Sequence, residues 1–152
     1  MMMRKSVAVL AGVLALGLGG CAGGGGVADN GQAAAADAAL SWVQGTEKVR
    51  CELESANYRY HSPDCSTVDN STPAWKDPSL YHTVRTVRWG TDAWAVVIAE
   101  GDNDSSPAVL GMVNEGGRWV LKSRGELNSI AKGSKNPECA ALSGPTAPEC
   151  AG

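Results

Sequence analysis

The sequence contains no phenylalanine, only two histidines, and no apolar run long enough to cross a membrane. Without phenylalanine, the five tryptophans become the main large side chains available for a core. The apolar run at residues 7–18 is twelve residues long, short of the roughly 20 that a spanning helix needs. His61 and His82 are the only imidazoles, and neither stands at ligand spacing from a cysteine pair.

Several motifs that carry chemistry are also missing. The chain has no Gly-x-Ser-x-Gly, no His-Glu-x-x-His, no phosphate-binding glycine loop and no Cys-x-x-Cys. The loop 102–106 resembles the start of a calcium loop, but Val113 stands where an EF-hand needs a glutamate. No cluster of lysines and arginines forms a basic patch. We therefore expect no cofactor, no metal site and no nucleic-acid partner.

The most informative feature that is present is Cys21. Arg4 and Lys5 supply a positive start, the apolar run follows, and Leu-Gly-Gly-Cys closes it at residues 18–21. This pattern is typical of a bacterial lipoprotein, with a signal peptide at 1–20 and a diacylglyceryl thioether on Cys21. The alternative is an ordinary secretory signal followed by a chance cysteine.

Residues 21–32 are rich in glycine and predict a flexible lipidated tether. Acyl chains on Cys21 would hold the protein stably on a membrane. We expect it to be anchored to the cell membrane by lipid and exposed on the extracytoplasmic side. All 16 acidic residues follow Cys21, against 11 basic ones, so the mature chain carries a net charge of −5.

The remaining cysteines, Cys51, Cys65, Cys139 and Cys150, form an even set. In an exported protein this predicts two disulfides. Four cysteines allow three pairings; the simplest joins Cys51 to Cys65 and Cys139 to Cys150.

Periodicity along the chain predicts an α+β fold. An alanine-rich helix at 33–44 stops at Gly45, and Thr46 caps a second helix over 47–55. Turn-forming residues fill 56–80. Four strands follow as an antiparallel meander, at 81–89, 93–100, 107–114 and 118–124. The second strand is apolar on both parities, so we place it centrally with both faces covered. The expected domain is 33–126, with two N-terminal helices packed on a curved sheet. Residues 126–131 are expected to form a short helix, and 127–152 is otherwise expected to be an irregular tail closed by a disulfide.

Three segments carry a resemblance to a known family: ALSWV at 39–43, WGTDAWAVVI at 89–98 and GGRWVLK at 116–122. Together with the element order, they make the chain similar to the nuclear transport factor 2-like (cystatin-like) α+β roll found in many actinobacterial lipoproteins. The resemblance covers about residues 33–126. It implies a function among isomerases, dehydratases and non-catalytic binding or assembly proteins. Catalytic members set an Asp–His or Tyr–Asp pair in the cone of the roll, and no such pair matches here residue by residue.

Three functions are consistent with these features. The leading hypothesis is a non-catalytic envelope lipoprotein that binds a partner protein or an apolar ligand, with Trp89, Trp94 and Trp119 as the candidate binding surface. The second is an envelope enzyme of the isomerase or hydrolase type that uses His61 or His82. The third is a secreted inhibitor-like module whose contact surface is the loop between Cys51 and Cys65.

Overall fold

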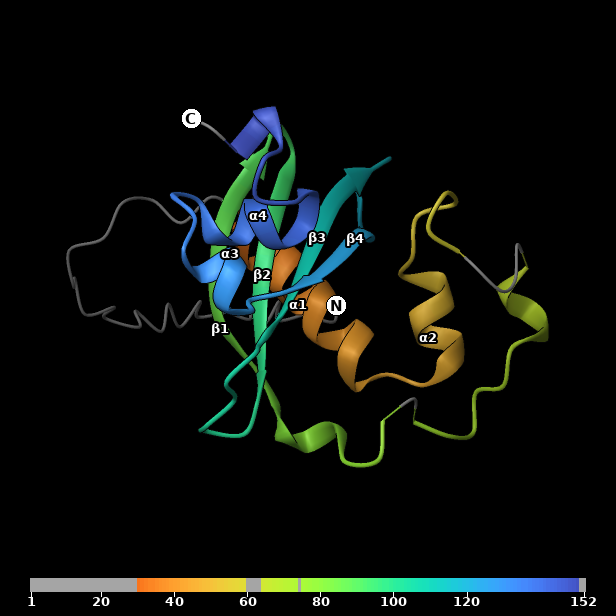
Figure 1. Cartoon of the computed structure of the whole chain (residues 1–152). Helices are drawn as coiled ribbons and strands as arrows, with labels where there is room; N and C mark the ends of the chain where they lie inside the picture. Colours follow the sequence, from red (N-terminus) through yellow and green to blue (C-terminus); the bar gives the residue numbers. More distant parts are fainter. Residues whose placement is uncertain (1–29, 60–63, 74, 151–152) are drawn as a thin grey trace, which may run out of the picture.

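The computed structural model describes residues 30–59, 64–73 and 75–150. It is an α+β fold in which helices accompany one four-stranded antiparallel sheet (Figure 1). The signal peptide, Cys21, most of the predicted tether and His61 lie outside the described residues.

The sheet is a meander in which every strand pairs with its neighbour in sequence. The strands are β1 (Tyr81–Gly90), β2 (Ala93–Glu100), β3 (Ala108–Glu115) and β4 (Arg118–Glu126), in the spatial order β1-β2-β3-β4. Two tight turns need backbone with positive φ, at Asp92 and at Gly116-Gly117, which short hairpin connections favour. The predicted strands are confirmed to within two residues at each end.

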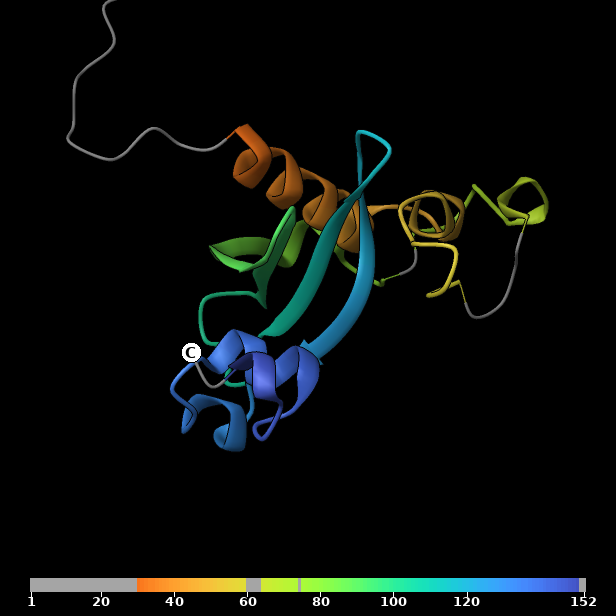
Figure 2. The same cartoon turned by 90° about the horizontal axis from the view of Figure 1, so that it is seen from above.

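The first helix, α1 (Asn30–Gln44), lies across one face of the sheet (Figure 2). Ala35 and Ala39 are fully buried, and these small side chains let the helix approach Val96, Ile98 and other side chains of the strands. Two glutamines of α1 hold the edge strand: Gln32 donates to the Thr86 carbonyl at 3.2 Å and Gln44 to the Tyr81 carbonyl at 3.1 Å. The helix starts three residues before the predicted 33–44.

The central position predicted for the second strand is confirmed. Seven of the eight residues of β2 are buried, and alternate residues enter two different cores. Val96 and Ile98 face α1, whereas Ala95 and Val97 face the C-terminal segment. The sheet is therefore the middle of three layers.

The prediction of an irregular C-terminal tail is wrong. Residues 127–150 contain α3 (Ser129–Lys132), α4 (Pro137–Ser143) and the 3-10 turn η3 (Pro148–Cys150), and they cover the second face of the sheet. Helices of four and seven residues are too short to show a 3.6-residue period. They form here because Leu127, Ala131 and Ala140 are buried against β2 and β3, and tertiary packing stabilises helices that would not persist alone.

Two covalent or charged links hold α4 in place. Cys139 is bonded to Cys150, with their Cα atoms 5.5 Å apart, so the predicted disulfide closure of this segment is confirmed. Glu138, which is 8% exposed, accepts from Arg85 Nε at 2.6 Å and pairs with its Nη2 at 2.5 Å. Because Arg85 belongs to β1, this ion pair joins the last helix to the edge strand.

The second helix does not pack on the sheet as predicted. α2 (Glu47–Glu52) lies beside the β4 edge, where it packs mainly against α1 and the turn η1 (Cys65–Thr67) (Figure 2). Thr46 caps it as predicted, with its Oγ1 accepting from Val49 N at 3.4 Å.

This helix stops at Glu52, short of the predicted 55, because the next residues pair with β4. Leu121 N donates to Leu53 O at 2.7 Å, and Ser55 N donates to Leu121 O at 2.8 Å. Backbone that makes these sheet bonds cannot also make helical ones. The predicted disulfide between Cys51 and Cys65 then ties α2 to the loop that follows.

Candidate binding groove

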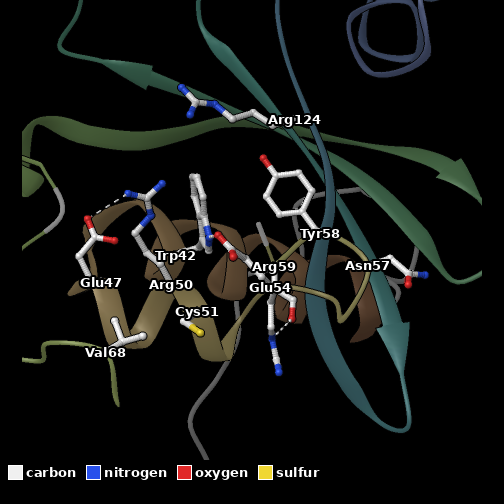
Figure 3. A pocket seen from close by; sticks show the side chains of 10 residues that line it. All are labelled: Trp42, Glu47, Arg50, Cys51, Glu54, Asn57, Tyr58, Arg59, Val68 and Arg124. Carbon is white, nitrogen blue, oxygen red and sulfur yellow. Dashed lines mark hydrogen bonds and ion pairs between the residues drawn. The ribbon is translucent and has the colours of Figure 1, made fainter. Parts of the chain in front are cut away.

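A groove of about 630 Å³ opens between α2, the segment that follows it and strand β4 (Figure 3). We call this space the Arg50–Arg124 groove. Its described lining residues come from α1, α2, the loop after α2 and β4: Trp42, Glu47, Arg50, Cys51, Glu54, Asn57, Tyr58, Arg59, Val68 and Arg124.

The floor of the groove is a cluster of stacked guanidinium and indole groups. The guanidinium carbon of Arg50 lies 4.0 Å from the ring centroid of Trp42 and 5.3 Å from that of Trp75. The guanidinium carbon of Arg124 lies 5.9 Å and 5.6 Å from the same two rings. Such cation–π contacts are worth about 0.5–2 kcal/mol each, more when they are shielded from water. They fix two arginines from different elements beside each other.

The accessible apolar wall comes from other residues. Trp42 is only 2% exposed, so it supports the arginines rather than offering an open ring face. Tyr58 and Val68 are partly exposed and line the groove. In Figure 3, Arg50, Trp42 and Tyr58 project toward the side on which Arg124 lies, whereas Arg59 projects away from it. The groove therefore combines a polar end with an apolar side.

Acidic residues of the groove are already engaged with its floor. Trp42 Nε1 donates to Glu54 Oε1 at 3.0 Å, which orients the indole under Arg50. Glu47 lies 3.8 Å from Arg50 Nη1, but its side chain is 55% exposed. Water screens an exposed pair at that distance, so its attraction is weak. The charge of Arg50 is thus only partly balanced.

Burial determines the ionisation of the groove. It is the main reason that the pKa of Arg50 is lowered; Glu47 and Glu54 oppose the shift, and Arg124 adds to it. Burial likewise raises the pKa of the Tyr58 phenol, and the positive charge of Arg124 opposes that shift. Because burial raises its pKa above the ordinary value, the Tyr58 phenol is neutral at neutral pH.

Two polar atoms near the groove have no hydrogen-bond partner among the described residues. They are Arg50 Nε and Trp75 Nε1, both buried. A buried donor without a partner costs about 1–3 kcal/mol. A smaller hollow of about 200 Å³ shares Trp42 and Arg124 with the groove and continues it toward Tyr81, whose ring centroid lies 5.9 Å from that of Trp75.

The three tryptophans proposed from sequence do not form one surface. Trp94 and Trp119 belong to the core under α1, and Arg88 covers the Trp94 ring at 4.5 Å. Trp89 packs on the opposite face, where it fills the space above Gly111. Trp42 belongs to the buried core, as expected, and also lines the groove, whereas Trp75 packs against the core and lines the neighbouring hollow.

Of the two histidines considered for catalysis, the structure describes His82. His82 is exposed on the edge strand β1 and is not among the residues that line the groove, and His61 lies outside the described residues. No group of three or more potential metal ligands occurs within residues 30–59, 64–73 and 75–150. In the same ranges, no helix has the length and apolar character needed to cross a membrane.

The arginines of the groove were missed because nothing in the sequence joins them. Arg50 and Arg124 are 74 positions apart, and each occurs in an element whose pattern is dominated by its apolar residues. The bridge between Glu54 and Leu121 and the hydrogen bond from Arg118 Nη2 to Glu52 O bring α2 beside β4.

Comparisons with protein-family models, with curated proteins and with solved structures find no match to this chain. The resemblance to the nuclear transport factor 2-like roll stays a prediction, and the function must be argued from the groove.

Proposed function

We propose that this chain is a lipid-anchored protein of the cell envelope whose α+β domain binds an amphipathic small molecule in the Arg50–Arg124 groove without catalysing a reaction. The observation that carries the proposal is the groove itself. Its volume of about 630 Å³ falls within the range of about 300–1,000 Å³ that small-molecule sites usually have. The partly exposed Tyr58 and Val68 supply apolar contact.

Binding is favoured over catalysis by the residue types that line the groove. Its described lining residues include no histidine, and Cys51, its one cysteine, is in a disulfide. Proton transfer by an imidazole or attack by a thiolate would need such groups, and the two lining glutamates are engaged by Trp42 Nε1 and by Arg50.

A small ligand is also favoured over a partner protein. Exposed apolar side chains do occur on the edge strand β1, where Val84 is 49% and Val87 is 37% exposed. However, the carbonyls of Tyr81 and Thr86 on this strand already accept hydrogen bonds from α1. The edge is therefore less available for pairing with a strand of another protein.

The anchor is tested at Cys21. In cells, we expect mass spectrometry to find an amino-terminal Cys21 that carries a diacylglyceryl thioether, and Cys21→Ser to remove the protein from the washed membrane fraction. An uncleaved chain with an unmodified Cys21 would refute the anchor and leave the groove untouched.

The groove is tested with a neutral apolar probe, N-phenyl-1-naphthylamine, whose fluorescence rises when it leaves water. The protein is the mature chain, residues 21–152, with Cys21→Ser to keep acyl chains off. Val68→Gln should weaken binding about tenfold, because burying a valine side chain contributes about 1.5 kcal/mol. Val84→Gln makes the same change on β1, outside the groove, and should leave the affinity unchanged. Absence of binding, or equal loss in both variants, would overturn the proposal.

A further inference from the structure

Resting on the proposed function, we infer that the groove selects ligands that carry an acidic group, and that Arg50 and Arg124 together bind this group. The ligand class is an organic acid, a carboxylate or a phosphate ester, with an apolar body that contacts Tyr58 and Val68.

The first argument is the fixed placement of the two guanidinium groups. Arg50 comes from α2 and Arg124 from β4, yet both lie within 6 Å of the ring centroids of Trp42 and Trp75. The Trp42 ring, 4.0 Å from the guanidinium carbon of Arg50, restrains that group, whereas Arg124 lies near the limit of such contacts, at 5.6 and 5.9 Å. An arginine that is already ordered loses less entropy when it binds a carboxylate or phosphate.

The second argument is charge, because Arg50 and Arg124 place two positive charges at the same groove. The third lining arginine, Arg59, projects away from it (Figure 3), and the described lining residues also include two glutamates. One of these glutamates, Glu54, accepts a hydrogen bond from the Trp42 indole, and the other, Glu47, forms an ion pair with Arg50 at 3.8 Å but is 55% exposed, so water screens it. Two like charges that share a partly buried space repel each other, and an anion between them would remove this repulsion.

The third argument is the donor that lacks a partner. Arg50 Nε is buried and makes no hydrogen bond to a described residue. Arginine has five N–H donors in a fork that fits carboxylate and phosphate oxygens. A bound acid would satisfy guanidinium donors that the described residues leave open.

The inference is tested with two probes that differ mainly in one acidic group. 1-Anilinonaphthalene-8-sulfonate is N-phenyl-1-naphthylamine with an added sulfonate. In the mature chain with Cys21→Ser, we expect the sulfonate to bind about tenfold more tightly than the neutral probe, as one charged hydrogen bond contributes about 1.5–3 kcal/mol. Added sodium chloride should lower the affinity for the sulfonate and leave the affinity for the neutral probe unchanged.

Substitutions assign the selectivity to the arginines. Arg124→Gln should weaken binding of the sulfonate about tenfold more than it weakens binding of the neutral probe. Arg50→Gln is the companion variant, but Arg50 is largely buried and its loss can unfold the domain. Arg124 is exposed, so we expect Arg124→Gln to stay folded even if Arg50→Gln does not. Arg88→Gln is the matched control, since Arg88 also covers a tryptophan ring, at 4.5 Å, but does not line the groove.

The outcomes separate the inference from the proposed function. If both probes bind equally, or Arg124→Gln weakens both alike, acid selection is refuted while the groove still binds an apolar ligand. If neither probe binds, the proposed function fails and the inference fails with it. Displacement of the sulfonate by 1-naphthoate would indicate a free acid, and displacement by vesicles of phosphatidylglycerol but not phosphatidylcholine would indicate a lipid headgroup; either result supports the inference.

Discussion

Among glycine-to-alanine substitutions in the sheet, Gly125→Ala should lower the free energy of unfolding the most. Gly125 lies on β4 directly beneath α4, and a Cβ built there would stand 1.8 Å from the carbonyl oxygen of Ala141 and 2.5 Å from its carbonyl carbon. Ordinary contacts begin near 3.4 Å, so the helix backbone would have to move by about 1.6 Å. A flexible side chain could turn aside, but a helix backbone cannot.

The size of the effect follows from what holds α4. The helix is tied by the bond between Cys139 and Cys150, by the ion pair of Glu138 with Arg85 and by burial of Ala140. Overpacking a well-fitted site usually costs about 1–3 kcal/mol, and a clash with backbone belongs at the upper end. We therefore expect a loss of about 3 kcal/mol, which would lower the melting temperature by about 10 °C in a domain of this size.

Thermal unfolding followed by circular dichroism measures the effect, with two other glycines as controls. Gly111→Ala would place its Cβ 2.7 Å from a side-chain atom of Trp89; this ring can shift, so the loss should be smaller. Gly133→Ala meets nothing nearer than 3.5 Å, at a φ of −77°, and should be nearly neutral. If Gly125→Ala melts at the temperature of Gly133→Ala, α4 does not pack on β4 as described.

Three further predictions concern the groove and the edge strand. Replacing Cys51 and Cys65 together by serine should cost about 3 kcal/mol in thermal unfolding, from a bridge that spans 14 residues, and should weaken probe binding; unchanged binding would show that α2 keeps its place without the bridge. Arg85→Met should cost about 2 kcal/mol in urea unfolding, because Glu138 is left buried without its partner, whereas Glu138→Gln should cost less; equal losses would contradict this. Because the pKa of Tyr58 is raised in the folded protein, the neutral phenol adds to the free energy of unfolding below the pKa of the unfolded phenol, about 10. This contribution is lost as pH rises through the pKa of the folded protein. Tyr58→Phe should therefore reduce the fall in the free energy of unfolding at alkaline pH, as measured by unfolding at several pH values.

Much of the sheet could be predicted because its signals are local. Alternation and turn residues mark each strand, and the uniformly apolar run of β2 indicates a strand with two covered faces. The strand order and the burial of seven β2 residues agree with that prediction. The same reasoning identified α1 and its stop at Gly45, where a Cβ would meet Ser41 O and Val49 at 2.6 Å.

The C-terminal layer could not be predicted in the same way. α3 and α4 have four and seven residues, so they present no periodicity, and prolines and glycines around them favour a loop by composition. Their helical form depends on Ala131 and Ala140 meeting the second face of the sheet. The apolar pattern of β2 predicts a cover on both of its faces, but no pattern in residues 127–150 marks that segment as the second cover.

The amino-acid sequence by itself determined the strands, the first helix and an even set of cysteines for two bridges, because hairpins and helices are specified by residues that are neighbours in the chain. The tertiary structure alone decided which face each tryptophan occupies and that Arg50 and Arg124 share one groove. Arg50 and Arg124 come together because the segment after α2 pairs with β4. A contact between segments so far apart in the chain depends on both of them, so neither segment alone shows a sequence pattern that predicts it.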